Sequence, residues 1–158
     1  MQAILSFLLL LSQLSCVVTG LLLTVPPVSP RKPLKVLVLH GFHSNGRSLS
    51  VYLNRFVDEC QPFAKFTFLD APHIVPALDN EKGNESNGRK KRRNSKFSWL
   101  SDNGEFDSSL SFLRQIEVEL GPFDVCIGHS QGACVLAAIH ALEVKLFKNL
   151  KLSIFLSV

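Results

Sequence analysis

The apolar positions of this chain fall into short unbroken runs that alternate with longer amphipathic segments. Four runs have the length and composition of strands buried on both faces of a parallel sheet, at residues 35–40, 65–69, 124–127 and 150–156. Between them, apolar residues recur every three or four positions, which predicts helices over 49–60, 108–120 and 131–142. This alternation predicts a doubly wound, mostly parallel α/β sheet with right-handed crossovers.

Polar and helix-breaking residues mark the ends of the predicted helices. Ser48 is a suitable N-cap for the first helix, and Pro62 closes it. Asp107 or Ser108 caps the second helix, and the Gly-Pro pair at 121–122 ends it. The third helix is built almost entirely of small apolar residues, so we expect it to be buried.

The chain length of 158 residues has room for one domain. Three segments lie outside the alternating pattern. Residues 1–24 form an apolar leader, residues 25–34 a Pro-rich linker, and residues 79–95 a polar, basic insertion that we expect to be exposed. The predicted domain occupies residues 35–158 and is interrupted by that insertion.

The apolar leader has two interpretations. Residues 3–23 are long enough to cross a membrane, and small residues near Thr19 and Gly20 would permit cleavage, so the leader could be a secretory signal or an anchor. It lacks a positively charged start and contains several polar residues, which suits a misassigned first exon or a buried N-terminal extension. Membrane contact is expected only through residues 3–23.

The formal net charge of +4 comes from one place. Six of the 17 basic residues lie between Arg89 and Lys96, and without them 11 basic residues face 13 acidic ones. We therefore expect no nucleic-acid partner for the domain as a whole. The RKKRR run at 89–93 is read first as a solvated loop, then as a nuclear-import signal, and last as a contact for nucleic acid or anionic lipid.

The cysteines do not form a recognisable framework. Cys16 would leave with a cleaved leader, and Cys60, Cys126 and Cys134 contain no CxxC pair, so neither a disulfide scaffold nor a zinc site is expected. Cys126 and Cys134 fall in apolar runs, which predicts buried free thiols. This pattern favours a reducing compartment. In contrast, the Asn84 glycosylation sequon would be used only in the secretory pathway.

Residues 128–132 (GHSQG) carry the candidate chemistry. The GxSxG pattern lies between a predicted buried strand and a predicted helix, which is the setting of a nucleophile elbow with Ser130 as the nucleophile. Glycines at both flanks are needed because any side chain there would collide with neighbouring backbone. The alternative interpretation is a Gly/Ser turn without chemistry.

The same turn predicts an oxyanion hole. Its donors would be the backbone N–H of Gln131, which follows the nucleophile, and that of Phe42, in the turn after the first strand. His40 is read as packing against or orienting that turn. No histidine is placed as the base of a triad, because after Ser130 the chain offers only His140 and then Glu143, in the wrong order.

Four segments resemble one known family. LHGFHSNG at 39–46, LDAPH at 69–73, KFSWL at 96–100 and GPFDVCIGHSQGA at 121–133 are similar to the FSH family of serine hydrolases, a branch of the α/β-hydrolases. The resemblance implies a carboxylic-ester hydrolase that acts on small-molecule or lipid-like esters, without a metal or an organic cofactor. It implies Ser130 as nucleophile and Phe42 and Gln131 as oxyanion donors.

The resemblance also places the triad Asp and His beyond the equivalent of Val158. We therefore expect a hydrolase domain that is incomplete at its C-terminus, with an exposed apolar strand at 150–156, and we expect the 158-residue chain alone to be inactive and poorly soluble. The first alternative is a catalytically inactive pseudo-hydrolase or binding module. The second is an acyl-protein thioesterase-like enzyme, since HGF followed by GxSQGA is shared with that group. The family implies a cytoplasmic or nuclear location, whereas the apolar leader implies a secretory or membrane one.

Overall fold

The central feature of the fold is a four-stranded parallel sheet. The computed structural model describes residues 32–76 and 95–156. Across the sheet the strands run in the order β2-β1-β5-β6, with every neighbouring pair parallel. Their bounds are β1 Leu34–Leu39, β2 Ala64–Leu69, β5 Val125–His129 and β6 Leu152–Leu156. The order places β1 and β5 side by side in the centre of the sheet, although more than eighty residues separate them in the chain.

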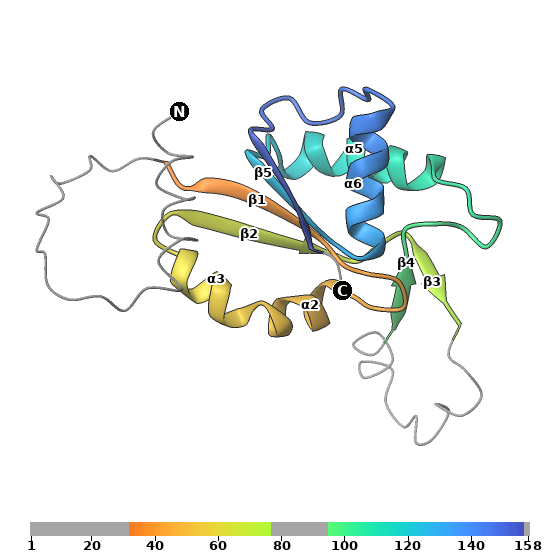
Figure 1. The fold of residues 1–158 in the computed structure, drawn as a ribbon, viewed down its shortest axis with the longest axis horizontal. Coiled ribbons are helices and arrows are strands. Elements are labelled where there is room, and N and C mark those ends of the chain that lie inside the picture. The colour runs from red at the N-terminus through yellow and green to blue at the C-terminus, as the bar shows by residue number, and fades with distance from the viewer. Residues whose placement is uncertain (1–31, 77–94, 157–158) are drawn as a thin grey trace, which may run out of the picture. The chain divides into compact units, whose positions relative to one another are not determined.

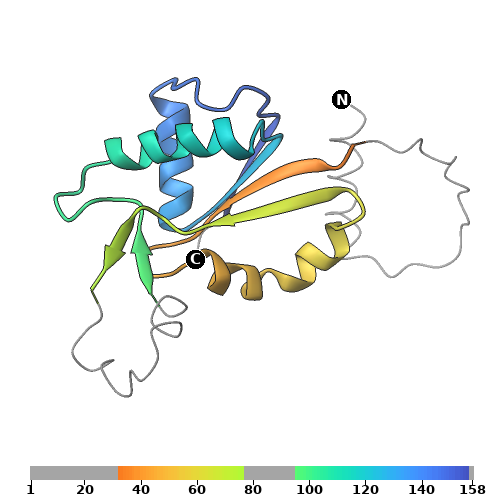
Figure 2. The same cartoon turned by 180° about the vertical axis from the view of Figure 1, so that it is seen from behind.

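Helices cover both faces of the sheet (Figures 1 and 2). One face carries α2 (Gly46–Tyr52) and α3 (Asn54–Cys60), and the other carries α5 (Asp107–Leu120) and α6 (Gln131–Ala141). Strand, helix and strand follow one another in the order that the apolar pattern predicts. The predicted doubly wound α/β class is therefore confirmed.

The main core lies between the sheet and the α5–α6 layer. Side chains on one face of the strands meet the apolar faces of both helices, and burying them from water is the main stabilising contribution. The members with least exposure are Leu37, Leu39, Trp99, Leu113, Phe123, Cys126, Val135 and Leu136. Trp99 is the largest of them and is fully buried.

A second, two-stranded sheet lies near the carboxyl end of β2 (Figure 1). It pairs β3 (His73–Val75) with β4 (Lys96–Ser98) in antiparallel register. The apolar pattern does not predict this sheet, because strands of three residues are too short to show a two-residue repeat. The Phe97 N–H donates to the Ser44 carbonyl at 2.8 Å and attaches β4 to the turn after β1.

The single helix predicted over 49–60 is wrong, since two short helices occupy that range. They meet at Leu53, which ends α2 and precedes α3 with φ −94° and ψ 9°. The predicted cap is also wrong, because the N-cap is Asn45, whose Oδ1 accepts the Ser48 N–H at 2.7 Å. Neither Asp107 nor Ser108 caps α5, whose N-cap position is Phe106 without a side-chain hydrogen bond.

The prediction that the third helix is wholly buried is wrong for one of its faces. Gly132, Val135, Leu136 and Ile139 of α6 are buried, whereas Cys134 is exposed. A helix that packs on one face of a sheet leaves its opposite side in solvent, whatever its composition. Of the two thiols predicted to be buried, Cys126 is buried, which raises its pKa, whereas the prediction is wrong for Cys134.

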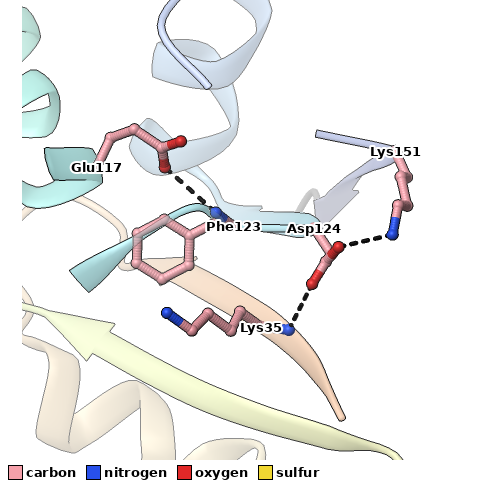
Figure 3. A network of polar contacts seen from close by, with 5 residues as sticks. All are labelled: Lys35, Glu117, Phe123, Asp124 and Lys151. Carbon is pink, nitrogen blue, oxygen red and sulfur yellow. Dashed lines mark hydrogen bonds and ion pairs between the residues drawn. The ribbon is translucent and has the colours of Figure 1, made fainter. Parts of the chain in front are cut away.

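A polar network fastens the amino ends of β1, β5 and β6 (Figure 3). Asp124 accepts the Lys35 backbone N–H at 3.0 Å and the Lys151 ammonium at 2.7 Å. Although partial burial alone would raise the pKa of Asp124, these two hydrogen bonds lower it. Nearby, the buried Glu117 carboxylate accepts the Phe123 N–H at 3.3 Å. These contacts give Asp124 a structural role.

Several predicted segments lie outside the described residues. They are the leader at 1–24, most of the linker and nearly all of the insertion at 79–95, which includes the RKKRR run and Asn84. Within 32–76 and 95–156, no helix combines the length and the hydropathy that a membrane crossing requires.

Candidate active site

The candidate site forms where the carboxyl ends of β1 and β5 meet. Because the two strands are parallel neighbours, the turns that follow them lie at the same edge of the sheet. A methyl group built on Gly41 would lie 3.2 Å from the Ser130 Cβ, so the two turns are in contact. The fold therefore brings the segment that holds Phe42 next to the segment that holds Ser130 and Gln131.

Ser130 occupies a sharp turn between β5 and α6. Its φ of 50° and ψ of −114° are rare for a residue with a side chain, and such a conformation costs on the order of 1–3 kcal/mol. Ser130 N–H donates to the Leu156 carbonyl at 2.9 Å, and its own carbonyl accepts the Ala133 N–H at 2.9 Å. The side chain is exposed. The turn thus holds a strained serine at the carboxyl end of the central strand β5.

The glycines on both sides of this turn are sterically required. A Cβ on Gly128 would lie 2.5 Å from the Gly132 carbonyl oxygen, and a Cβ on Gly132 would lie 2.5 Å from the Leu39 carbonyl oxygen. Both neighbours are backbone atoms, which cannot move without shifting a strand or a helix. The predicted collision of any flanking side chain with backbone is confirmed.

Two backbone N–H groups beside Ser130 are free. Among the described residues, no acceptor takes a hydrogen bond from the Phe42 N–H or from the Gln131 N–H. Gln131 is the first residue of α6, where N–H groups have no partner within the helix and the helix dipole is positive. The Phe42 side chain is 60% exposed, so this turn reaches the surface. The two N–H groups belong to the two turns that meet at Gly41 and Ser130.

His40 supports the turn after β1 from the protein interior. Its Nε2 accepts the Ala71 N–H at 3.0 Å, which leaves Nδ1 as the protonated nitrogen, and Nδ1 donates to the Gly41 carbonyl at 2.6 Å. The ring is fully buried, and this burial lowers the pKa of His40. His40 is therefore a neutral imidazole that orients the turn, as one of the two sequence readings proposed.

The remainder of the turn is fastened residue by residue. The Asn45 side-chain amide donates to the Ser95 carbonyl at 2.9 Å, and the Gly46 N–H donates to Asp70 Oδ1 at 2.8 Å. His43 has a positive φ of 54° and is half-buried. A turn held at so many points is preorganised, which is what an electrostatic site requires.

None of the other described histidines hydrogen bonds to Ser130, although the His129 Nδ1 lies only 3.1 Å from the position of a Cβ built on Gly41. His73 hydrogen bonds to Ser108 at 2.7 Å, His140 to Ser153 at 2.8 Å, and the His129 ring lies 6.0 Å from that of Tyr52. No histidine nitrogen in the described part of the chain hydrogen bonds to the Ser130 hydroxyl. In the same ranges, no three His, Cys, Asp or Glu side chains gather closely enough to hold a metal ion.

A comparison with protein-family models decides the family. The model described as Serine hydrolase (FSH1) matches residues 28–158. The chain belongs to this FSH family of serine hydrolases. The match covers both turns of the candidate site and the whole four-stranded sheet, and the sheet with its flanking helices agrees with an α/β-hydrolase-like fold.

Curated relatives of this FSH-family chain carry esterase names. Esterase AAEL000016 of Aedes aegypti is 29% identical over 138 residues, which are 80% of this chain and 49% of the relative. Esterase CG5412 of Drosophila melanogaster is 28% identical over 124 residues, 75% of this chain and 44% of the relative. Esterase OVCA2 of Danio rerio is 29% identical over 132 residues, which are 70% of this chain and 57% of the relative. The chain spans about half the length of these relatives.

Sequence reasoning missed the residues that support the turns. No role was predicted for Asp70, Asn45 or Trp99, although the LDAPH, LHGFHSNG and KFSWL segments that contain them were part of the family resemblance. Their hydrogen bonds join residues that lie 24 to 59 positions apart. The local pattern of apolar and polar residues does not predict contacts over such distances in the chain. The only signal was that each of these residues lies in one of three motifs of the family resemblance.

Proposed function

We propose that this FSH-family chain provides the nucleophile and the oxyanion hole of a carboxylic-ester hydrolase. Ser130 Oγ attacks the carbonyl carbon of a small-molecule or lipid-like ester, and the carbonyl oxygen becomes an oxyanion. The N–H groups of Phe42 and Gln131 donate to that oxyanion. Collapse of the intermediate breaks the ester C–O bond, releases the alcohol and leaves an acyl group on Ser130; water then hydrolyses the acyl-enzyme.

The observation that carries this proposal is the pair of free N–H groups on either side of an exposed, strained serine. The two donors lie in different turns that touch at Gly41 and Ser130, which is the arrangement that an oxyanion hole requires. The loss of one oxyanion donor typically lowers turnover by about 10²–10³-fold, so the turn that holds Phe42 would contribute substantially to the rate.

The proposed mechanism needs a general base that takes the Ser130 proton and returns it to the leaving alcohol. The family resemblance assigns this role to a histidine held by an aspartate, and we place neither of them among the described residues. In the part of the chain that the structure describes, Ser130 Oγ has no histidine partner. The described residues thus contribute the position of the attacking Ser130 hydroxyl and the two N–H groups that stabilise the oxyanion.

Labelling with a fluorophosphonate, which phosphonylates activated serines, tests the proposal. Although full turnover is not expected without the general base, the oxyanion donors alone can leave a residual rate of about 10³–10⁴-fold over water, so the full chain should be labelled slowly and Ser130→Ala should remove all label. Ser50→Ala is the matched control, because Ser50 lies on α2 and hydrogen bonds only to its own helix. A label that survives in Ser130→Ala, or a native, folded chain that takes up none, contradicts the proposal.

A catalytically inactive binding module is the second candidate function, and the absence of a histidine partner for Ser130 among the described residues favours it. Such a module would bind an ester or a carboxylate at the two N–H groups without turning it over. Ester hydrolysis by the full chain, lost in Ser130→Ala and kept in Ser50→Ala, would exclude this candidate. Saturable binding of a carboxylate with no measurable turnover would favour it.

A further inference from the structure

The hairpin of β3 and β4 has no role in the mechanism above, yet one of its neighbours touches both turns of the site. Trp99 directly follows β4 and is fully buried. Its ring lies 5.4 Å from the His40 ring and 6.5 Å from that of Phe112, and its carbonyl accepts the Ser109 hydroxyl. A side chain packed on all sides in this way has one available position.

The indole of Trp99 acts on the turn after β1. Its Nε1–H donates to the His40 carbonyl at 2.8 Å, and its ring packs against the His40 imidazole, which in turn donates from Nδ1 to the Gly41 carbonyl. That carbonyl belongs to the same planar peptide unit as the Phe42 N–H. In a trans peptide the C=O and N–H point in opposite directions, so a fixed Gly41 carbonyl fixes the direction of the Phe42 N–H.

The backbone of Trp99 acts on the turn after β5. Its N–H donates to Gln131 Oε1 at 2.9 Å, and Gln131 Nε2 donates to the Ser98 hydroxyl at 3.2 Å. The Gln131 side chain is therefore anchored to the end of β4 through both of its polar atoms. Because Gln131 is the first residue of α6, this anchor holds the helix terminus that carries the second free N–H.

We propose that Trp99 is a positioning residue that sets both N–H donors of the oxyanion hole, the Phe42 donor through its indole and His40, and the Gln131 donor through its backbone. The inference rests on the proposed function for its catalytic meaning. It assigns the FSW segment at 97–99 a purpose: the hairpin couples two turns that belong to different strands. A misplacement of about 1 Å in such a site can cost about 10²-fold in rate.

Two variants of the full chain separate the two contacts. Trp99→Phe keeps an aromatic ring and the backbone N–H but removes the indole donor, and Gln131→Met keeps its own backbone N–H but removes the side-chain anchor. For each variant we expect the second-order rate of Ser130 phosphonylation to fall about 10–100-fold. Where ester turnover is measured, kcat should fall while KM stays within about twofold, because an oxyanion donor acts in the transition state.

The matched control is Phe123→Leu. Phe123 is also a buried aromatic residue of the main core, but it packs on Phe147 and follows α5 at the amino end of β5. A loss of core packing lowers the melting temperature of this variant, yet the rate of phosphonylation should match that of the wild type. A similar fall in all three variants would show that general destabilisation, and not positioning, controls the rate.

Amide resonances give a readout that does not depend on activity. In ¹H–¹⁵N spectra of the full chain, Trp99→Phe should move the Phe42 and Gln131 amides, while Phe123→Leu should leave both in place. Unchanged amides overturn the inference. A folded wild-type chain that takes up no label contradicts the proposed function instead, and the amide shifts then decide by themselves whether Trp99 positions the two donors.

Discussion

At the scale of single residues, the site depends on the absence of one methyl group. Gly132 lets the first turn of α6 approach the end of β1, where the Leu39 carbonyl oxygen would lie 2.5 Å from an added Cβ and the His40 carbonyl oxygen 2.8 Å. Neither atom can move by itself, since both belong to the backbone of a central strand and its turn. The close approach is also what brings the Gln131 N–H near the turn that holds Phe42.

Gly132→Ala should therefore move α6 away from β1. We expect the free energy of unfolding to fall by about 1–3 kcal/mol, the usual cost of overpacking, and the phosphonylation of Ser130 to slow. Urea unfolding and the labelling rate measure these effects. Cys134→Ala is the control, because Cys134 is an exposed residue of the same helix and should leave both quantities unchanged. A Gly132→Ala chain with wild-type stability would contradict the steric argument.

His40 makes stability depend on pH. Because burial lowers its pKa in the folded state below the ordinary value of 6.5, the unfolded chain takes up a proton that the folded chain rejects. This contribution to stability is present above pH 6.5 and is lost as the pH falls below it, at a rate of at most about 1.4 kcal/mol per pH unit. The same protonation would prevent Nε2 from accepting the Ala71 N–H.

Melting temperatures between pH 5 and pH 8 test this prediction. The wild type should melt at a lower temperature as the pH drops below 6.5, and His40→Gln, which does not titrate there, should show a flatter profile. His73→Gln serves as control, since His73 is a surface residue that hydrogen bonds to Ser108 and should leave the wild-type profile in place. Parallel profiles for His40→Gln and the wild type would contradict the role assigned to burial.

At the scale of elements, ion pairs and caps hold the amino end of the sheet. Lys35 extends from β1 to the end of α5, where its ammonium donates at 2.8 Å to the carbonyls of Leu120 and Gly121. These carbonyls have no partner within the helix. A positive charge there is also stabilising, because the C-terminal end of the helix dipole is negative. Asp124 accepts a hydrogen bond from the backbone N–H of the same Lys35. Lys35 therefore links β1, the end of α5 and the start of β5.

Asp124→Asn should weaken this link. An asparagine would offer an uncharged oxygen and an N–H₂ group where Lys35 N–H and the Lys151 ammonium both donate, and we expect about 1–2 kcal/mol less stability at pH 7. Since the pKa of Asp124 is lowered in the folded state, its contribution is present above the ordinary pKa of 3.8 and disappears as the pH falls through the lowered value. The two proteins should therefore converge in acid.

Urea unfolding of both proteins at pH 7 and below pH 3 measures this difference. Asp58→Asn is the comparison, because Asp58 is an exposed carboxylate on α3. If Asp58→Asn loses as much stability at pH 7 as Asp124→Asn, net charge and not the network explains the effect.

The elements also show what the sequence can predict and what it cannot. The contact between the Phe42 and Ser130 turns follows from two apolar runs that read as parallel strands, because the carboxyl ends of such strands share one edge. The break at Leu53 was missed because apolar residues continue at helical spacing through it. The hairpin and Trp99 were missed because their contacts join distant residues whose partners become evident only in the folded chain.

At the scale of the whole molecule, the two outer strands of the main sheet differ. β2 is covered on one side by α2 and α3, whereas β6 carries Phe155 with 49% of its surface exposed and has no charged residue between Leu152 and Leu156. Within the described residues, the outer edge of β6 has no partner strand. An uncharged apolar edge of this kind can pair with the same edge of another molecule.

Phe155→Lys should therefore reduce self-association of the chain. A lysine on an outer strand opposes edge-to-edge pairing, because a second copy would bring like charges together. Light scattering at increasing protein concentration measures the effect. Val118→Lys introduces the same charge at an exposed apolar position on α5, 82% exposed, and should change the scattering much less. Equal reductions in both variants would indicate that net charge, not the edge, governs solubility.

The fastening network of Lys35, Asp124 and Lys151 lies at the opposite end of the sheet from Ser130, and this separation has a consequence for evolution and engineering. Sequence changes at the amino ends of the strands can alter the stability of the fold without changing the geometry of the turns that hold Phe42 and Ser130. A library that varies only the surroundings of Asp124 should yield more robust chains with unaltered Ser130 reactivity. Such chains would be the best starting point for redesigning the Phe42 and Ser130 turns at the opposite end of the sheet.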